Sequence, residues 1–245
     1  MQIDTIALRL RLRSPMESAD LGVRLCQQTA RATYSCYALV AIPTIAFSLA
    51  SFEIATWLPT LLLWWAKPWL DRSVVFVLSR AAFSQDTRWR DLWRARRVVW
   101  WHQLLRTWTL RRLSPWRSFT QPVYQLEGLK GGAQRKRVRQ IRTGKSGAAL
   151  LVTSTYSLLE LIFSFALISL IFWFAPAGQE PDYRLLFSGD SALQTVELAI
   201  AVSYAIVVLF LEPFYVASGF AMYLNRRVEL EAWDIEQELR RAFAR

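Results

Sequence analysis

Four long apolar stretches separated by polar segments run along the 245-residue chain. A helix needs about 20 predominantly apolar residues to cross the hydrocarbon core of a bilayer. Four windows reach that length, at 34–52, 57–78, 148–175 and 198–224. The pattern therefore predicts an all-α bundle of about four transmembrane helices, arranged as two hairpins.

Prolines interrupt the second and fourth windows, and each follows a charged residue. Lys67 precedes Pro68 and Glu212 precedes Pro213, and in both cases an aromatic residue and then an apolar run follow. A proline inside a helix removes one backbone hydrogen bond and kinks the helix. We therefore predict kinks at both prolines, with the end of the span as the alternative. The matching order also indicates a parallel internal repeat, whose halves enter and leave the membrane on the same side.

Composition and charge place this bundle relative to the membrane. The chain is 53% hydrophobic with 12 tryptophans and has a mean hydropathy of +0.19, values that soluble domains seldom combine. Between positions 71 and 145 there are 18 lysines and arginines but only four acidic residues. Because basic segments stay on the cytoplasmic side, we expect this segment and both termini in the cytoplasm.

The pattern divides the chain into a first hairpin with an amphipathic helix before it (1–83), a basic insert (84–147), a second hairpin (148–225) and a cytoplasmic helix (226–245). The helix before the first hairpin begins at Ser14 as N-cap, with Pro15 at its first position and Glu17 at its third, which is a capping box. Its apolar stripe is modest. We therefore expect an amphipathic helix that lies in the cytoplasm against the lipid headgroups.

The insert is dense in tryptophan and arginine. Trp89, Trp93, Trp100 and Leu104 fall on one arc of a helical wheel, which favours burial. Arginines lie beside this arc, however. Indole and guanidinium groups side by side are typical of a segment in the headgroup region.

A run of basic residues leads from the insert into the third apolar window. On the cytoplasmic side of a membrane such a run contacts anionic phospholipid, and each charge contributes about 1 kcal/mol near the surface. Nucleic acid is the alternative polyanion, but no nucleic-acid-binding motif is present and we expect none as a partner. The predicted headgroup contacts are Arg135, Lys136, Arg137, Arg139, Arg142 and Lys145.

Five charged residues stand within the apolar windows, at Lys67, Asp71, Arg72, Glu160 and Glu212. An unpaired charge inside a bilayer costs several kcal/mol, so we expect these residues to form pairs, with Lys67 and Glu212 in contact. Such a polar cluster either fixes the packing of the helices or belongs to a polar pathway or substrate pocket. No nucleophile with a base, metal-ligand spacing or phosphate loop is present. We therefore expect neither an enzyme nor a cofactor.

Several motifs together resemble an uncharacterised family of proteobacterial multi-pass inner-membrane proteins. They are "RSPMESADLG", "WWAKPWLDRSVVFVLSRAAF", "RRLSPWRSFTQPVYQLEGL" and "EPFYVASGFAMYLNRRVELEAWDIE". The end of the last motif is also distantly similar to the membrane domain of some glycerophosphodiester phosphodiesterases, although no catalytic domain of that kind is present. Members of the resembling family are encoded near a MoxR-type AAA+ ATPase, a von Willebrand factor type A-like protein and a transglutaminase-like membrane protein. The resemblance implies a bacterial inner-membrane location and these proteins as partners.

Two functions are compatible with these features. The first is a non-enzymatic membrane subunit or scaffold that assembles partners at the cytoplasmic face. The alternative is a small transporter or lipid-handling protein that uses the intramembrane charges. A continuous polar cavity that reaches Glu160 and Glu212 would favour transport, whereas closed ion pairs would favour the scaffold.

Overall fold

The computed structural model describes residues 13–101, 108, 113–174 and 190–231, and within them every regular element is helical. Three helices are long and apolar enough to cross a membrane. They are α2 (Ala30–Ala50), α8 (Ser146–Trp173) and α9 (Asp190–Glu231). The predicted all-helical class is confirmed, and these helices are those of a membrane protein.

The predicted second span forms helix α3 (Leu58–Ala81), which packs against α2 and α9. Its charged residues lower its hydropathy below that of the other three helices, but Lys67, Asp71 and Arg72 are all buried inside the bundle. Pro68 and Pro213 lie inside α3 and α9, which both continue past the proline. Neither proline therefore ends its helix.

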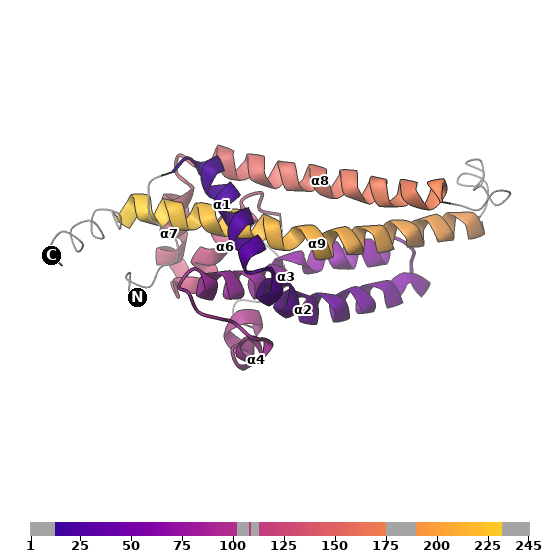
Figure 1. Ribbon diagram of the computed structural model, residues 1–245, viewed down its shortest axis with the longest axis horizontal. Helices are drawn as coiled ribbons and strands as arrows, with labels where there is room; N and C mark the ends of the chain where they lie inside the picture. The colour runs from indigo at the N-terminus through magenta and orange to yellow at the C-terminus, as the bar shows by residue number, and fades with distance from the viewer. Residues whose placement is uncertain (1–12, 102–107, 109–112, 175–189, 232–245) are drawn as a thin grey trace.

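The long helices form an elongated bundle (Figure 1). The short 3-10 helix η2 (Ser51–Glu53) follows α2 at one end, which we call the outer end. The helices α6 (Arg117–Leu126) and α7 (Gly131–Arg142) lie at the opposite, inner end. Helix α9 is central, because it packs against α1, α2, α3, α6, α7 and α8. At about 1.5 Å per residue its 42 residues span roughly 63 Å, about twice the hydrocarbon core, so its inner part extends beyond a membrane.

Helix α1 (Pro15–Gln28) begins as predicted, with the Ser14 hydroxyl accepting a hydrogen bond from the Glu17 N–H at 3.2 Å. Helix α1 crosses α9 (Figure 1), and the face it buries there comprises Ser18, Ala19, Gly22, Leu25 and Cys26. Small residues allow this crossing. A Cβ atom at Gly22 would lie 2.2 Å from the Ala217 carbonyl oxygen, so only glycine permits so close an approach of the two backbones.

The predicted tryptophan stripe of the insert is only partly buried. Trp89 and Trp93, on α4 (Trp89–Arg94), are each 52% exposed, whereas Trp100 is buried and donates a hydrogen bond to the Ser73 hydroxyl at 3.0 Å. Although α4 ends at Arg94 and a π-helical segment η3 (Arg97–Trp101) follows, the Trp93 and Trp100 rings contact each other with their centroids 6.1 Å apart. Leu104 lies outside the described residues.

Two of the predicted boundaries do not separate structural units. Helix α6 belongs to the insert by sequence, yet it packs against α3 and α9. Helix α9 runs without a break through position 225 to Glu231, so the second hairpin and the start of the predicted cytoplasmic helix are one element. The remainder of that predicted helix lies outside the described residues.

Candidate functional site

Five charged side chains from four helices meet inside the bundle, and we call them the ion cluster. Lys67 and Asp71 come from α3, Arg117 from α6, Glu160 from α8 and Glu212 from α9. The Lys67 Nζ lies 2.7 Å from Glu212 Oε2 and donates to Glu160 Oε1. Arg117 Nη2 donates to Glu212 Oε1 at 2.5 Å. Its Nε lies 2.8 Å from Asp71 Oδ2, close enough for an ion pair.

Burial of the ion cluster is almost complete. Glu212 is 0% and Asp71 1% exposed, and Lys67 and Arg117 are also buried. Charges so far from water persist only with opposite charges beside them. Burial alone would lower the pKa of Arg117, but the carboxylates of Asp71 and Glu212 raise that pKa well above its ordinary value. Arg117 therefore remains a cation.

The positions of these residues follow from local helix geometry. Lys67 and Asp71 are four residues apart, so they share one face of α3. Arg117 is the first residue of α6, and Gln121, one turn later, donates to the Pro68 carbonyl at 3.1 Å. The Arg117 guanidinium also lies over the Tyr215 ring, 5.2 Å from its centroid. Together these contacts hold α6 against α3 and α9.

Small residues let α6 come close enough for these contacts. A Cβ atom at Gly219 on α9 would lie 2.4 Å from the backbone carbon and the side chain of Ser118. Tyr215 accepts a hydrogen bond from the Ser118 N–H at 3.4 Å, and the Tyr156 and Ser218 hydroxyls lie 3.1 Å apart. The "EPFYVASGF" stretch of α9 thus carries both the central carboxylate and the small surface on which α6 packs.

The predicted contact between Lys67 and Glu212 is confirmed, and Glu160 joins it as a second partner of Lys67. Arg72 does not enter the ion cluster. Its Nη2 lies 3.5 Å from the Val98 carbonyl oxygen of the insert. The sequence pattern did not indicate Arg117, because it stands outside the four apolar windows in which charged residues were expected to pair. One signal was available, since the three carboxylates outnumber Lys67 and Arg72 by one, which leaves a negative charge that requires another cation.

Two cavities adjoin the ion cluster. A cavity of about 260 Å³ is lined by Lys67, Arg117 and Glu160, among others. A larger groove of about 730 Å³ lies between α3, α8 and α9 and reaches towards the outer end. Glu160 lines both, whereas Glu212 lines neither. The groove wall is mostly apolar and aromatic, with Glu197 as a second carboxylate.

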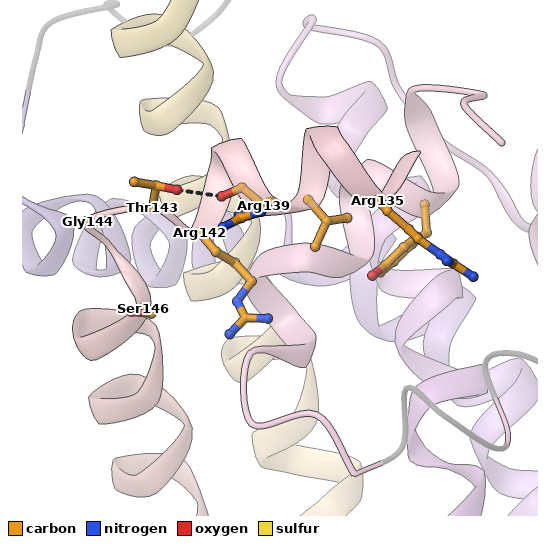
Figure 2. A pocket seen from close by; sticks show the side chains of 8 residues that line it. Arg135, Arg139, Arg142, Thr143, Gly144 and Ser146 are labelled. Atoms are coloured by element: carbon orange, nitrogen blue, oxygen red, sulfur yellow. Dashed lines mark hydrogen bonds between the residues drawn. The ribbon is translucent and has the colours of Figure 1, made fainter. Parts of the chain in front are cut away.

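The six predicted headgroup residues fall into two groups. Arg137 pairs with Glu127 at 2.9 Å and with Glu231, and Lys145 pairs with Glu229 at 2.8 Å. Burial alone would lower the pKa of Arg137, but its hydrogen bonds to the two carboxylates raise it. The other group faces away from these acids: Lys136 is exposed, and Arg135, Arg139 and Arg142 line a third cavity (Figure 2).

Charged side chains and hydroxyl groups line these sites. Within the described ranges no three histidine, cysteine or acidic side chains are placed to hold a metal ion. Comparison with protein-family models, with curated proteins and with solved structures gives no match.

Proposed function

We propose that this chain is a non-enzymatic membrane subunit that holds partner proteins at the cytoplasmic face. The observation that supports this most is the closed ion cluster. Four of its five members are buried, and each carboxylate has a cation within 3 Å. This arrangement joins the insert to the transmembrane helices. A rigid platform at the inner end of the bundle is what a scaffold requires.

The proposal includes four spans, α2, α3, α8 and α9, with both termini in the cytoplasm of a bacterial inner membrane. Support comes from the inner end, where the described segments that lie nearest the termini meet. Arg13 donates its backbone N–H to the Asn225 side chain at 3.2 Å, and Glu231 pairs with Arg137. A chain that begins and ends on one side crosses an even number of times. The dense basic residues at this end favour the cytoplasm.

Labelling of single cysteines tests this topology. The native Cys26 and Cys36 are buried and would be replaced by alanine. Ile54→Cys at the outer end, where Ile54 is 79% exposed, should react with a membrane-impermeant maleimide from the outside of intact cells. Lys136→Cys should react only after the membrane is opened. The same accessibility at both positions would contradict the proposed orientation.

The partner we propose is a MoxR-type AAA+ ATPase with its associated membrane proteins, which the sequence resemblance implies. The insert offers a surface for it, because Trp89 and Trp101 are 52% and 68% exposed at the side of the bundle. Large aromatic side chains are frequent anchors of protein interfaces. Four exposed arginines of α4, η3 and the residues between them accompany these tryptophans: Arg90, Arg94, Arg96 and Arg97.

Purification of the tagged full-length chain in mild detergent, at its natural abundance, tests this partnership. The ATPase should co-purify, and Trp89→Ala with Trp101→Ala should reduce its recovery at least severalfold. Trp57→Ala is the matched control, because Trp57 is equally exposed but lies near the outer end. Recovery of the chain without partners, or an equal loss with all variants, would contradict the scaffold role.

The groove between α3, α8 and α9 favours lipid handling as a second candidate function. Its volume of about 730 Å³ is within the usual range for small-molecule sites, and its wall is largely apolar with carboxylates at Glu160 and Glu197. A phospholipid with a photoreactive acyl chain should label Leu161, which lines the groove, more strongly than Leu158, which is exposed on the same helix but does not line it. Equal labelling would mean that α8 only contacts bulk lipid.

A further inference from the structure

A cavity of about 560 Å³ lies at the inner end, where α7 meets the start of α8. Figure 2 shows α7 crossing it, with Arg135 towards one end and Arg142 towards the other. Arg135, Arg139 and Arg142 are spaced by four and three residues, so they project from one face of α7. Tyr124 and the turn at 143–146 complete the wall, and no acidic residue lines it.

These three arginines differ from the other basic residues around them. Arg137, Lys145 and Arg226 each form an ion pair with a carboxylate. Within the described part of the chain, no carboxylate lies within ion-pair distance of Arg135, Arg139 or Arg142. The cavity is therefore lined by three arginines whose charge no described carboxylate compensates.

Contacts of neighbouring residues keep Arg139 and Arg142 available to a ligand. Basic residues in the last turn of a helix often cap its free carbonyl groups. Here Arg226 of α9 does so instead, because it donates to the Thr143 carbonyl at 3.0 Å and to the Gln140 carbonyl at 3.4 Å. The Arg142 guanidinium lies over the Trp116 ring, 3.5 Å from its centroid. Trp116 is itself fixed, because its indole N–H donates to the Ser146 carbonyl at 3.0 Å.

We propose that this cavity binds the phosphate group of an anionic membrane lipid. Guanidinium groups match phosphate oxygens in charge and in geometry, and three of them on one face favour an anion strongly. The cavity adjoins Ser146, the first residue of the apolar helix α8. The start of a membrane-crossing helix lies at the level of the phospholipid headgroups, so a lipid can present its phosphate there. The proposal requires a membrane location but not the scaffold role.

Lipid binding to the purified full-length chain in a neutral detergent tests the proposal, because single lipid molecules are then counted without a charged surface around them. Native mass spectrometry with phosphatidylglycerol should show one tightly bound molecule, and phosphatidylcholine should bind more weakly. A hydrogen bond to a charged group contributes about 1.5–3 kcal/mol, so Arg139→Gln and Arg142→Gln should each weaken phosphatidylglycerol binding about tenfold or more.

Lys136→Gln is the matched control. It removes the same charge from the same helix, but Lys136 does not line the cavity, so its effect should stay within about twofold. Equal losses for Lys136→Gln and Arg139→Gln, or equal binding of the two lipids, would overturn the proposal. Size-exclusion chromatography checks that each variant is folded. Arg139 is exposed, which makes unfolding of that variant unexpected, and Arg135→Gln is a further variant on the same cavity.

A parallel titration with inorganic phosphate identifies the source of the phosphate group. If the lipid binds much more tightly than the free ion, and both respond to Arg139→Gln, a lipid headgroup is the ligand. If the free ion binds as tightly as the lipid, the cavity serves a soluble phosphate compound and the assignment to a lipid is wrong. If neither binds, the cavity has no phosphate ligand at all.

Discussion

Helices α8 and α9 lie side by side, yet they have different neighbours. Both are strongly apolar, with mean hydropathies of 1.7 and 2.0 in the 18-residue window that makes each a candidate span. Only 6% of that window of α8 is buried inside the protein, against 56% of that of α9. Phe165 of α8 is 64% exposed, whereas Phe220 of α9 is 1% exposed. Hydropathy therefore indicates which helices avoid water. It does not indicate which of them is buried by other helices of the protein.

Small and polar residues account for the difference. Ala217, Ser218 and Gly219 give α9 a narrow surface on which α1 and α6 pack, and Glu212 gives it the central carboxylate. In bilayers, where lipid is as apolar as leucine, close packing through small residues and interhelical polar contacts drives helix association. Helix α8 contributes Glu160 and the Tyr156 and Thr153 hydroxyls on one side, and presents leucine and phenylalanine elsewhere.

The largest effect is expected at the ion cluster. Arg117→Met would leave Asp71 without a cation and Glu212 with only Lys67, and loss of one partner of a buried pair costs about 3–5 kcal/mol. We expect loss of the folded peak in detergent size-exclusion chromatography and a much lower thermal midpoint. Arg139→Met removes an arginine that has no carboxylate near it and should leave both unchanged. A folded Arg117→Met protein with normal stability would contradict the structural role of the ion cluster.

Exchange of Lys67 and Glu212 probes the same network more finely. In an isolated pair the double reversal would restore the contact. Here a glutamate at position 67 would face Glu160, and a lysine at position 212 would face Arg117. In a thermal unfolding assay, the midpoint of the double variant should therefore be no higher than that of the more stable of the single variants Lys67→Glu and Glu212→Lys. Full recovery would mean that the two residues form an independent pair.

The contrast between α8 and α9 can be tested with one residue type. Phe220→Ala should destabilise the protein by about 3–5 kcal/mol, since it removes a buried aromatic ring. Phe165→Ala should have a small effect, because that ring is 64% exposed at the groove and buries little area against the protein. Thermal unfolding in the same detergent measures both. Similar losses would show that α8 also has a protein neighbour at Phe165, as expected for an oligomer.

Close packing through glycine predicts a smaller effect. Gly22→Ala would place a methyl group 2.2 Å from the Ala217 carbonyl oxygen, and overpacking of this kind costs about 1–3 kcal/mol. Gly147→Ala is the control, because nothing lies within 4 Å of its added Cβ and alanine favours the helix. The first variant should lower the midpoint of thermal unfolding, and the second should leave it unchanged or raise it.

The smallest effect is expected at the rim of the inner end. Lys145→Gln removes a partly exposed pair with Glu229, and pairs of this kind contribute about 0.2–1 kcal/mol. Thermal unfolding should shift slightly at low salt and not at high salt, because salt screens exposed charges. A loss as large as that of Arg117→Met would remove the distinction between the buried ion cluster and the peripheral pairs.

The sequence by itself determined the helical class, the positions of the long helices and the contact of Lys67 with Glu212. These features depend on local composition and on the high cost of an unpaired charge among apolar residues, which is the same wherever the chain folds. It also located the basic run, although not which of its residues find acidic partners.

Only the tertiary structure decided which residues complete these contacts. Arg117 enters the ion cluster because Gly219 lets α6 approach α9, and α1 packs closely on α9 because Gly22 fits against Ala217. Arg137 finds Glu127 and Glu231, while Arg139 faces the cavity. Arg117 and Glu212 are 95 residues apart and Arg137 and Glu231 are 94 apart, whereas Arg137 and Glu127 are only 10 apart but lie on different helices or loops. Periodicity along the chain contains no information about which faces of the helices meet.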